Sequence, residues 1–392
     1  MTSERRVLLK KGREKPLLNR HHWIFSGAVQ SLPNIEPGEI LPVYSWKKEL
    51  LGSAYFNPKS SILGRMLSFG KTPPLESLFS NMKNSISLRK RFFDEQHTNT
   101  YRLINGEGDN IPGLIIDKYA NTLVIQISTL GIERLKNKIL SFLLENFPSN
   151  LTIYEKSLLP SRKEEGLPAQ EGFLHGKENF EVEVFENNIH FIVSLTNSQK
   201  TGLFLDQREM RKLICTLSKN KRVLNAFSYT GGFSLYAAKG YAKEITSLDI
   251  SKQALETAKR NFQLNNLPSS KNSFICKDAF QFLRENPLPY DIIILDPPAF
   301  AKKKGDIKKA CRGYKDINRL TMQKMPENSL LLTCSCSYYV DEKLFQTVLF
   351  QAAAESQRRI QILEQHKQAY DHPINLYHPE GKYLKSFLLY LT

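Results

Sequence analysis

A short apolar run followed by an acidic residue and two prolines places the strongest constraint on how this chain can fold. Residues 292–295, Ile-Ile-Ile-Leu, are too few and too β-branched for a helix and predict a strand buried on both faces, as in a parallel sheet. Asp296, Pro297 and Pro298 follow at once. Proline favours neither helix nor further strand pairing, so this carboxylate and the two proline carbonyls should be fixed at the strand's carboxyl end. Open α/β sheets bind ligands at that edge.

A second strand of the same kind is expected at 329–333, and cysteines follow it. The sequence continues Cys334-Ser335-Cys336-Ser337. Side chains alternate along an extended backbone, so both cysteines are expected on the same side, facing one pocket. Two strand ends with such chemistry in one sheet predict a functional site.

The other cysteines indicate neither a disulfide framework nor a metal site. Five cysteines are an odd number, and no second ligand pair stands at a workable distance from the Cys-x-Cys. Cys215 and Cys276 are expected to be ordinary buried thiols, with Cys311 a remoter candidate for the site. A reducing cytoplasm is the expected location, because no secretory signal and no apolar run of about 20 residues is found.

From about residue 196 the chain alternates strands and helices, which predicts an α/β fold with a doubly wound parallel sheet. The earlier part, with many turn signals, predicts β-rich modules. Its segment 159–172 is expected to be a polar, mobile loop. The expected strands are 122–128, 180–184, 190–195, 223–227, 244–250 and 273–276, and the expected helices are 133–145, 252–265 (capped by Ser251), 280–285 and 341–358.

Net charge is the strongest global signal. The chain has 55 basic and 39 acidic residues, a formal charge of +16, which favours a polyanionic partner such as nucleic acid. Trp23 and Phe25 stand beside basic residues, as on RNA-binding surfaces, although we expect both in the core. Glu107 and Asp109 can form a catalytic or metal-binding pair, but a turn explains them better.

The turn after the strand at 223–227 predicts a nucleotide site. Its sequence, Asn-Ala-Phe-Ser-Tyr-Thr-Gly-Gly-Phe, lacks the glycine pattern that a pyrophosphate needs. Asp249, about 20 positions beyond, suits ribose hydroxyls. A ligand with ribose and adenine but no phosphate, S-adenosylmethionine, fits better, with Asn225 and the turn facing its methionine part and Asp278 and Ala279 near the adenine. The expected contacts are Asn225, Phe227, Tyr229, Thr230, Gly231, Asp249, Ile250, Asp278, Ala279 and Asp296.

Long motifs spread over nearly the whole chain resemble those of a known protein family. They are HHWIFSGAV, RLINGEGDNIPGLIIDKY, QKTGLFLDQRE, VLNAFSYTGGFSLYAA, LDIS, DPPAF, ACRGYKDIN, TCSCS and DHPINLYHPEGKYLKSF. The chain resembles large-subunit ribosomal RNA methyltransferases that form 5-methylcytosine in 23S rRNA. The resemblance implies a PUA module at 1–72, a β-rich middle domain at 73–190 and a Rossmann-like class I methyltransferase domain at 191–392. It also implies that Cys336 is the nucleophile and that four residues help close over the cofactor: Lys200, Phe204, Asp206 and Arg208.

The chemistry of cytosine supports a nucleophilic cysteine independently. Carbon 5 is too electron-poor to take a methyl group until a thiolate adds to carbon 6. The match of Ser-Cys-Ser favours Cys336 over Cys334, and Asp296 can steer protonation or hydrogen-bond the base. Ala299 stands where some cytosine methyltransferases have a further cysteine. A flipped-out base and its RNA are expected to contact Pro297, Pro298, Phe300, Lys302, Lys303, Lys304, Arg312 and Lys315.

Two other functions stay open at this point. Relatives with this architecture methylate guanine, for which no nucleophilic cysteine is needed. A non-catalytic RNA-binding protein of ribosome assembly is the other alternative, although the set of strand-end carboxylates argues against it. The expected partner is 23S rRNA or an assembling large subunit, with no membrane, and a homodimer is left open.

Overall fold

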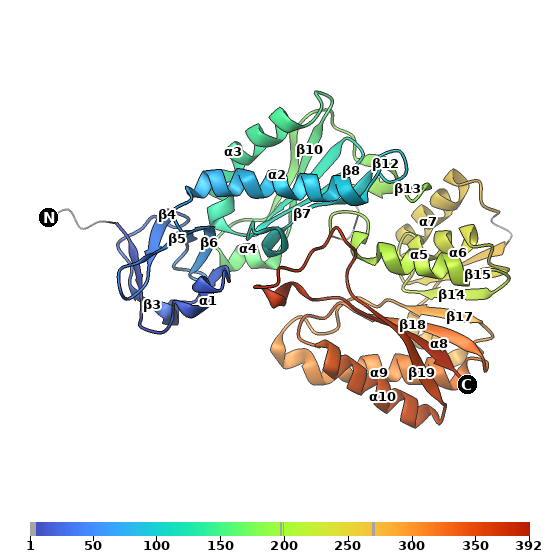
Figure 1. Cartoon of the computed structure of the whole chain (residues 1–392). Coiled ribbons are helices and arrows are strands. Elements are labelled where there is room, and N and C mark those ends of the chain that lie inside the picture. Colours follow the sequence, from blue (N-terminus) through green and yellow to red (C-terminus); the bar gives the residue numbers. More distant parts are fainter. Residues whose placement is uncertain (1–4, 197, 199, 269–270) are drawn as a thin grey trace. The chain divides into compact units, whose positions relative to one another are not determined.

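The computed structural model describes residues 5–196, 198, 200–268 and 271–392, and the chain forms two compact units (Figure 1). The first unit comprises 1–187, 193–205 and 370–381, and the second comprises 188–192, 206–369 and 382–392. Gln199, the first residue of one quoted motif, lies outside the described residues. Each unit is described by itself below.

The N-terminal part of the first unit is a six-stranded sheet. Its order is β2 (Trp23–Ile24), β6 (Gly64–Phe69), β5 (Leu50–Phe56), β4 (Ile40–Tyr44), β1 (Val7–Leu9) and β3 (Val29–Ser31). The short helix α1 (Lys15–Leu18) precedes β2. Alternating residues of the strands, such as Val7, Val43 and Phe56, are fully buried and form a separate core. This is the small β-rich module that the turn signals predicted.

The middle sheet has five strands in the order β11 (Gln170–His175), β10 (Thr152–Ser157), β9 (Thr122–Ile127), β8 (Leu114–Tyr119) and β7 (Thr100–Asn105). Helices α2 (Pro74–Phe92) and α3 (Leu130–Asn146) share its hydrophobic core, and the rings of Phe79 and Phe142 stack at 5.4 Å. The prediction of a mobile loop at 159–172 is wrong. Helix α4 (Pro160–Glu164), which contains the buried Arg162, and the start of β11 lie there. Strands β12 (Glu181–Glu186) and β13 (Ile189–Ser194) pair as a two-stranded sheet.

The second unit contains a seven-stranded sheet and confirms the Rossmann-like prediction. Its order is β16 (Asn272–Cys276), β15 (Glu244–Asp249), β14 (Arg222–Ala226), β17 (Ile292–Leu295), β18 (Ser329–Ser335), β20 (Lys385–Leu391) and β19 (Ile360–His366). The first five strands are parallel. β20 runs in the opposite direction, because it pairs antiparallel with both β18 and β19, and β19 therefore has the direction of the first five strands. The expectation of a parallel sheet did not include this reversed strand.

Helices cover both faces of this sheet. Figure 1 shows α5 (Arg208–Leu217), α6 (Gly232–Lys239) and α7 (Lys252–Leu264) on one face and α8 (Ala279–Glu285), α9 (Ile307–Lys324) and α10 (Glu342–Ser356) on the other. The predicted cap of α7 is confirmed: the Ser251 hydroxyl accepts the Ala254 amide at 3.2 Å. Two caps of the same type, Asp278 and Asp341, begin α8 and α10.

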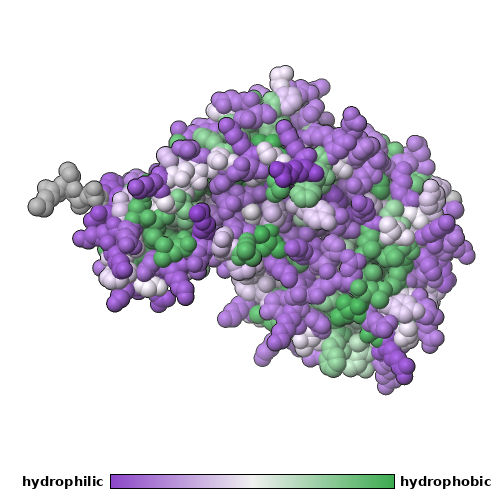
Figure 2. All heavy atoms as spheres, in the orientation of Figure 1, coloured by the Kyte–Doolittle hydropathy of each residue, from purple (hydrophilic) through white to green (hydrophobic). Residues whose placement is uncertain are grey.

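Two burial expectations are wrong. Phe25 is 51% exposed rather than in the core, because it lies between the end of β2 and the short 3₁₀ turn Ser26–Ala28, whereas Trp23 is partly buried. Cys276 is exposed because it ends β16, an edge strand. Hydrophilic residues cover most of the face in Figure 2, with separated apolar areas. Among the described residues, the longest helices are too polar to cross a membrane.

Candidate functional site

The candidate site lies where the strand order of the second unit reverses. Strands β15 and β16 extend to one side of β14, and β17 and β18 extend to the other. The ends of β14 and β17 are in register, with Ala226 opposite Leu295. The turn after Ala226 and the Asp-Pro-Pro turn after Leu295 therefore leave the sheet side by side. This is the topological switch point at which open α/β sheets bind ligands.

The turn after β14 has an unusual backbone. Phe227 and Tyr229 have φ values of 62° and 48°, in the left-handed region that side chains with a Cβ rarely adopt. Gly231 has φ 82°, and a Cβ there would lie 3.0 Å from the Ala258 Cβ. Asn261 holds the turn by donating its Nδ2 to the Thr230 carbonyl at 3.0 Å. The turn is therefore held in a strained backbone conformation. Residues with such strain cluster at functional sites.

Asp249, at the end of β15, is oriented by two backbone amides. Its Oδ2 accepts the Tyr229 N–H at 2.8 Å, and its Oδ1 accepts the Ser251 N–H at 2.8 Å. Each carboxylate oxygen retains a further lone pair, so the group can still accept hydroxyl donors. Ile250 beside it is 72% exposed, an apolar surface suited to a flat ring. Both features fit the predicted ribose and adenine contacts.

Two buried polar atoms near the turn lack an internal partner. Asn225 is 1% exposed and donates its Nδ2 to the Ser234 hydroxyl at 3.0 Å, but its Oδ1 has no hydrogen-bond partner among the described residues. The same is true of the Ser228 hydroxyl, 5% exposed. Buried polar atoms are almost always paired, so two such atoms together indicate a polar ligand. Sequence reasoning missed Ser228, although it lies inside the predicted turn.

The remaining predicted cofactor residues have several kinds of environment. The exposed Asp278 accepts the Gln281 amide as the cap of α8, followed by the buried Ala279. Asp206 and Arg208 are both buried, and the Tyr383 hydroxyl donates to Asp206 Oδ2 at 2.7 Å. The other two, Lys200 and Phe204, belong to the first unit, where the Lys200 ammonium lies 4.6 Å from the Phe204 ring centroid.

The two cysteines at the end of β18 differ sharply in environment. Cys334 lies inside the strand and is fully buried, and burial raises its pKa well above the ordinary value, with the Asp296 charge adding to the effect. Cys336 follows the strand and is half-buried, with its Sγ 3.9 Å from the carbonyl oxygen of Pro297. Cys334 interacts electrostatically with both Asp296 and Cys336, and the expectation that the two cysteines face one pocket stays a prediction.

Lys385 is a site residue that the sequence analysis missed. It pairs with Ser335 across β18 and β20, is 2% exposed, and donates its Nζ to the carbonyls of Ser337 and Tyr383 at 2.7 and 2.8 Å. Burial lowers its pKa to about 8, while the charge of Cys336 acts in the opposite direction. A thiolate and this ammonium therefore stabilise each other. The signal in the sequence was a lysine next to an apolar run that reads as a buried strand.

The predicted RNA contacts surround the Asp-Pro-Pro turn unevenly. Pro298, Lys302, Lys303, Lys304 and Arg312 are exposed, whereas Pro297 is buried. Phe300 packs against the buried Tyr314 at 4.5 Å between ring centroids, and the Tyr314 hydroxyl lies 2.9 Å from that of Ser337. The Lys315 ammonium pairs with Glu355 at 2.6 Å.

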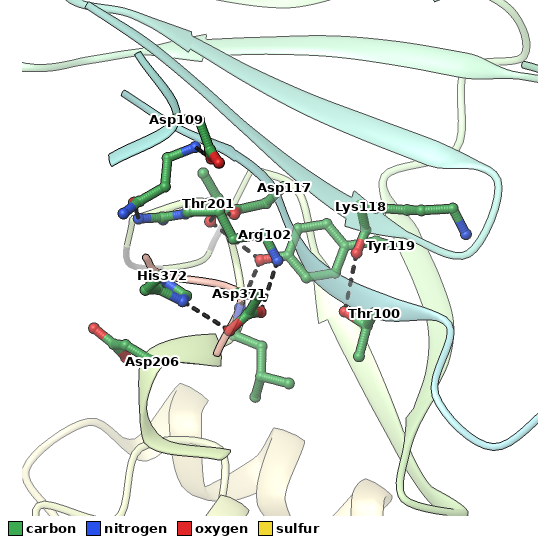
Figure 3. Close-up of polar contacts among 12 residues, drawn as sticks. Thr100, Arg102, Asp109, Asp117, Lys118, Tyr119, Thr201, Asp206, Asp371 and His372 are labelled. Carbon is green, nitrogen blue, oxygen red and sulfur yellow. Dashed lines mark hydrogen bonds and ion pairs between the residues drawn. The ribbon is translucent and has the colours of Figure 1, made fainter. Parts of the chain in front are cut away.

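Asp109, the second carboxylate of the Glu107–Asp109 pair, lies in a network of buried ion pairs in the first unit (Figure 3). Arg89 binds both oxygens of Asp109 at 2.6 and 2.7 Å, and Arg102 binds both oxygens of Asp117 at 2.8 and 3.0 Å. The Thr201 hydroxyl also donates to Asp117. These carboxylates are structural, in agreement with the interpretation of Asp109 as part of a turn.

The segment 370–381 joins the same network. Asp371 accepts the Arg102 amide at its Oδ2, at 2.8 Å, and accepts Arg89 at its carbonyl oxygen, also at 2.8 Å. Its other carboxylate oxygen lies 2.9 Å from Nδ1 of the buried His372 (Figure 3). The start of the C-terminal motif DHPINLYHPEG is therefore buried in the first unit, whereas Leu376 and Tyr377 farther along it are exposed.

Comparison with known proteins agrees with the site. Residues 167–373 match the family of S-adenosylmethionine-dependent methyltransferases, and residues 7–69 match the PUA-like domain family. These ranges do not test the boundaries predicted at 72/73 and 190/191, which stay a prediction. A SAM-dependent methyltransferase chain from Streptococcus mutans has a similar structure, with a TM-score of 0.83, 25% identity, and coverage of 99% of this chain and 100% of that one. Another methyltransferase, solved with S-adenosylhomocysteine, has a TM-score of 0.85 at 26% identity, covering 99% and 100%.

Curated relatives match over almost the full length. Ribosomal RNA large subunit methyltransferase I of Aliivibrio fischeri is 42% identical over 388 residues, which is 97% of this chain and 98% of that protein. The protein of the same name from Aeromonas salmonicida is 41% identical over 390 residues, 98% of each. The strained turn, the carboxylate at the end of β15 and the two unpartnered acceptors all fit the cofactor of these proteins. The chain is therefore an S-adenosylmethionine-dependent methyltransferase that belongs to the ribosomal RNA large subunit methyltransferase I family.

Proposed function

We propose that this chain methylates carbon 5 of a cytidine in 23S ribosomal RNA through a transient covalent bond to Cys336. The relatives' name supports large-subunit ribosomal RNA as the substrate. One observation carries the mechanism: Cys336 is half-buried at the end of β18, with its Sγ 3.9 Å from the Pro297 carbonyl of the Asp-Pro-Pro turn. A thiol for which guanine methylation has no use thus lies beside the turn expected to receive the base.

The residues of the second unit fit the cofactor. Asp249 would accept the ribose hydroxyls, and Ile250 and Ala279 would border the adenine, with Asp278 at its edge. Asn225 Oδ1 and Ser228 Oγ, both buried without an internal partner, would hydrogen-bond polar groups of the methionine part. When bound, S-adenosylmethionine supplies an electrophilic methyl group on sulfur.

The chemistry then assigns the protein's steps. The Cys336 thiolate forms a bond to carbon 6 of cytosine, and the electrons of the 5,6 double bond make carbon 5 nucleophilic. Carbon 5 would take the methyl group as the sulfur–methyl bond breaks and S-adenosylhomocysteine leaves, and it would afterwards give its proton to a base. The electrons of that carbon–hydrogen bond restore the double bond, and Cys336 leaves as the thiolate. Asp296, at the end of β17, would hydrogen-bond the base or steer protonation at its ring nitrogen.

Lys385 would hold Cys336 in the reactive form. Its ammonium is fixed by the carbonyls of Ser337 and Tyr383 and interacts electrostatically with Cys336. The Cys334 thiol would stay inert, because burial raises its pKa. Two neighbouring cysteines are thereby given different roles by their surroundings alone.

Basic residues beside the site would hold the RNA. Lys302, Lys303 and Lys304 are exposed and directly follow the Asp-Pro-Pro turn, with Arg312 exposed on α9. The target base would leave its stack to reach Cys336. Phe300 would shape the pocket rather than stack freely, since Tyr314 already covers it.

Mass spectrometry of unmodified 23S rRNA, incubated with the protein and labelled S-adenosylmethionine, tests the proposal. We expect labelled 5-methylcytidine from the wild type, none from Cys336→Ala, and product from the matched control Cys311→Ala. Calorimetry of S-adenosylmethionine binding shows whether the Cys336→Ala site is intact.

Other products would redirect the mechanism. A labelled guanosine, or a product indifferent to Cys336, would remove the covalent step while leaving the cofactor site. A wild-type protein that fails to bind S-adenosylmethionine would favour a non-catalytic role in ribosome assembly.

A further inference from the structure

We propose that His21, His378 and Glu380 of the first unit form a binding site for a divalent metal ion, of which Zn²⁺ suits the ligands best. One residue, His22, separates His21 from the start of β2 in the N-terminal sheet. His378 and Glu380 lie in one tight turn of the segment 370–381, closed by the hydrogen bond from the Gly381 amide to the His378 carbonyl at 3.3 Å. Residues far apart in sequence are therefore brought together with metal-binding atoms.

The distances suit a single ion. His21 Nε2 lies 3.4 Å from Glu380 Oε1, and His378 Nδ1 lies 3.6 Å from Glu380 Oε2. One ligand atom from each residue falls within 4.8 Å of the other two. In tetrahedral zinc sites with bonds of about 2.0–2.1 Å, the ligand atoms are roughly 3.3 Å apart. Contraction by at most about 1.5 Å would complete three ligands and leave a fourth position for water.

A second observation points to a missing ligand. His378 is 2% exposed, and neither its Nδ1 nor the buried Glu380 Oε2 has a hydrogen-bond partner among the described residues. Their separation of 3.6 Å is too long for a hydrogen bond between them. One cation between these two atoms would satisfy both, whereas leaving buried polar atoms unpaired is costly.

The surroundings make the site rigid and identify a spectroscopic reporter. The Trp23 ring packs edge-on against His378 at 4.5 Å between centroids, and its Nε1 donates to Glu107 at 2.9 Å. The Trp23 backbone amide donates to His21 Nδ1 at 3.2 Å. A metal on Nε2 would place the ring proton on Nδ1, so this hydrogen bond must be released. Metal binding should therefore change both the fluorescence and the amide resonance of Trp23.

The two types of ligand atom, nitrogen and oxygen, determine which metal ion the site would prefer. Two imidazole nitrogens and one carboxylate oxygen suit Zn²⁺, whereas Mg²⁺ and Ca²⁺ prefer oxygen ligands alone. The side chain of Glu380 is 31% exposed and that of His21 16%, so the ion can enter from solvent. Once bound, it would fasten the N-terminal sheet to the segment 370–381.

The test is titration of the chelator-treated full chain with Zn²⁺ by calorimetry and with Co²⁺ by absorption. We expect one ion per chain, an intense tetrahedral Co²⁺ spectrum, and quenching by Co²⁺ in a Trp46→Phe variant that retains Trp23. Loss of a ligand in His378→Gln or Glu380→Gln should weaken binding by about 100-fold or more. The matched control is His97→Gln, since His97 lies 3.8 Å from Asp94 Oδ2 on the exposed surface.

Thermal unfolding guards against misfolded variants. Zn²⁺ should raise the Tm of the wild type and of His97→Gln but not that of Glu380→Gln, whose circular dichroism without metal should equal the wild type's. Absence of saturable binding to the wild type, or equal binding by wild type and His378→Gln, would overturn the proposal. If both ligand variants unfold, a six-coordinate Co²⁺ spectrum of the wild type overturns it and a tetrahedral one supports it.

Discussion

The middle sheet of the first unit and the cofactor turn of the second both bury polar side chains, but they treat them in opposite ways. In the sheet, Arg102 and Asp117 meet in a two-pronged ion pair that also takes the Thr201 hydroxyl. At the turn, Asn225 Oδ1 and Ser228 Oγ are equally buried and have no partner among the described residues. A buried polar group with internal partners thus has a structural role, whereas one without such partners indicates a ligand.

Breaking the ion pair should give the largest effect. Asp117→Asn leaves Arg102 buried with its charge uncompensated, so we expect a loss of about 3–5 kcal/mol in the free energy of unfolding, measured in urea. Glu95→Gln is the matched control, because Glu95 is paired at 2.9 Å with the neighbouring Lys118 but its side chain is 57% exposed, and it should cost less than about 1 kcal/mol.

Removing both charges sharpens this result. The double variant Arg102→Met with Asp117→Leu should recover much of the stability lost by Asp117→Asn, since no unpaired charge remains. Equal losses in Asp117→Asn and Glu95→Gln would show that burial does not separate the two pairs.

Lys385 is the intermediate case, a buried cation whose ammonium is hydrogen-bonded to the carbonyls of Ser337 and Tyr383. We expect Lys385→Met to lower the rate of methyl transfer about 100-fold, because a fixed charge beside Cys336 is lost. The wild-type rate should rise with pH as the thiolate forms and fall above about pH 8, where Lys385 loses its proton.

Lys385→Arg separates charge from shape. Arginine stays protonated, so this variant should lose the decline above pH 8. A decline that persists in Lys385→Arg would assign the alkaline limb to another group.

The unpartnered hydroxyl of Ser228 should matter for the ligand alone. Ser228→Ala removes no side-chain hydrogen bond to the described part of the chain, so S-adenosylmethionine affinity should fall about tenfold while the free energy of unfolding is unchanged within about 0.5 kcal/mol. Calorimetry and urea unfolding measure the two quantities.

Ser234→Ala is the opposite control. Its hydroxyl contacts Asn225 at 3.0 Å and Ser247 at 2.7 Å, and its loss should cost about 1 kcal/mol of stability. If Ser228→Ala destabilised the protein as much as Ser234→Ala, the unpartnered atom would be structural.

Solvated charges should give the smallest effect per residue. Lys302→Gln is expected to weaken RNA binding roughly fourfold at 0.15 M salt, and replacing Lys302 to Lys304 together should lower the salt slope by about 2. Filter binding at several salt concentrations measures both. An unchanged slope in the triple variant would remove these lysines from the RNA path.

Local signals in the sequence were sufficient for much of the second unit. The apolar run at β17 fixed that strand, and Ser251 marked the start of α7, because each signal acts within a few residues. The acidic residue ending β15 and the turn after β14 were found in the same way. These elements contain most of the predicted cofactor residues.

Contacts between distant segments were not predictable. Nothing near Lys385 indicates that β20 inserts between β18 and β19, so its place beside Cys336 came only from the structure. The same holds for His378, which meets His21 across most of the chain. Phe25 and Cys276 were misjudged because an aromatic or sulfur side chain does not show which strand is an edge.

The route of the chain between its units has a consequence for synthesis. Asp371 accepts hydrogen bonds from Arg89 and Arg102, yet it is translated after residues 206–369 of the second unit. Domains fold as they emerge from the ribosome. The hydrogen bonds from Arg89 and Arg102 to Asp371 can therefore form only after nearly all of the second unit has been made.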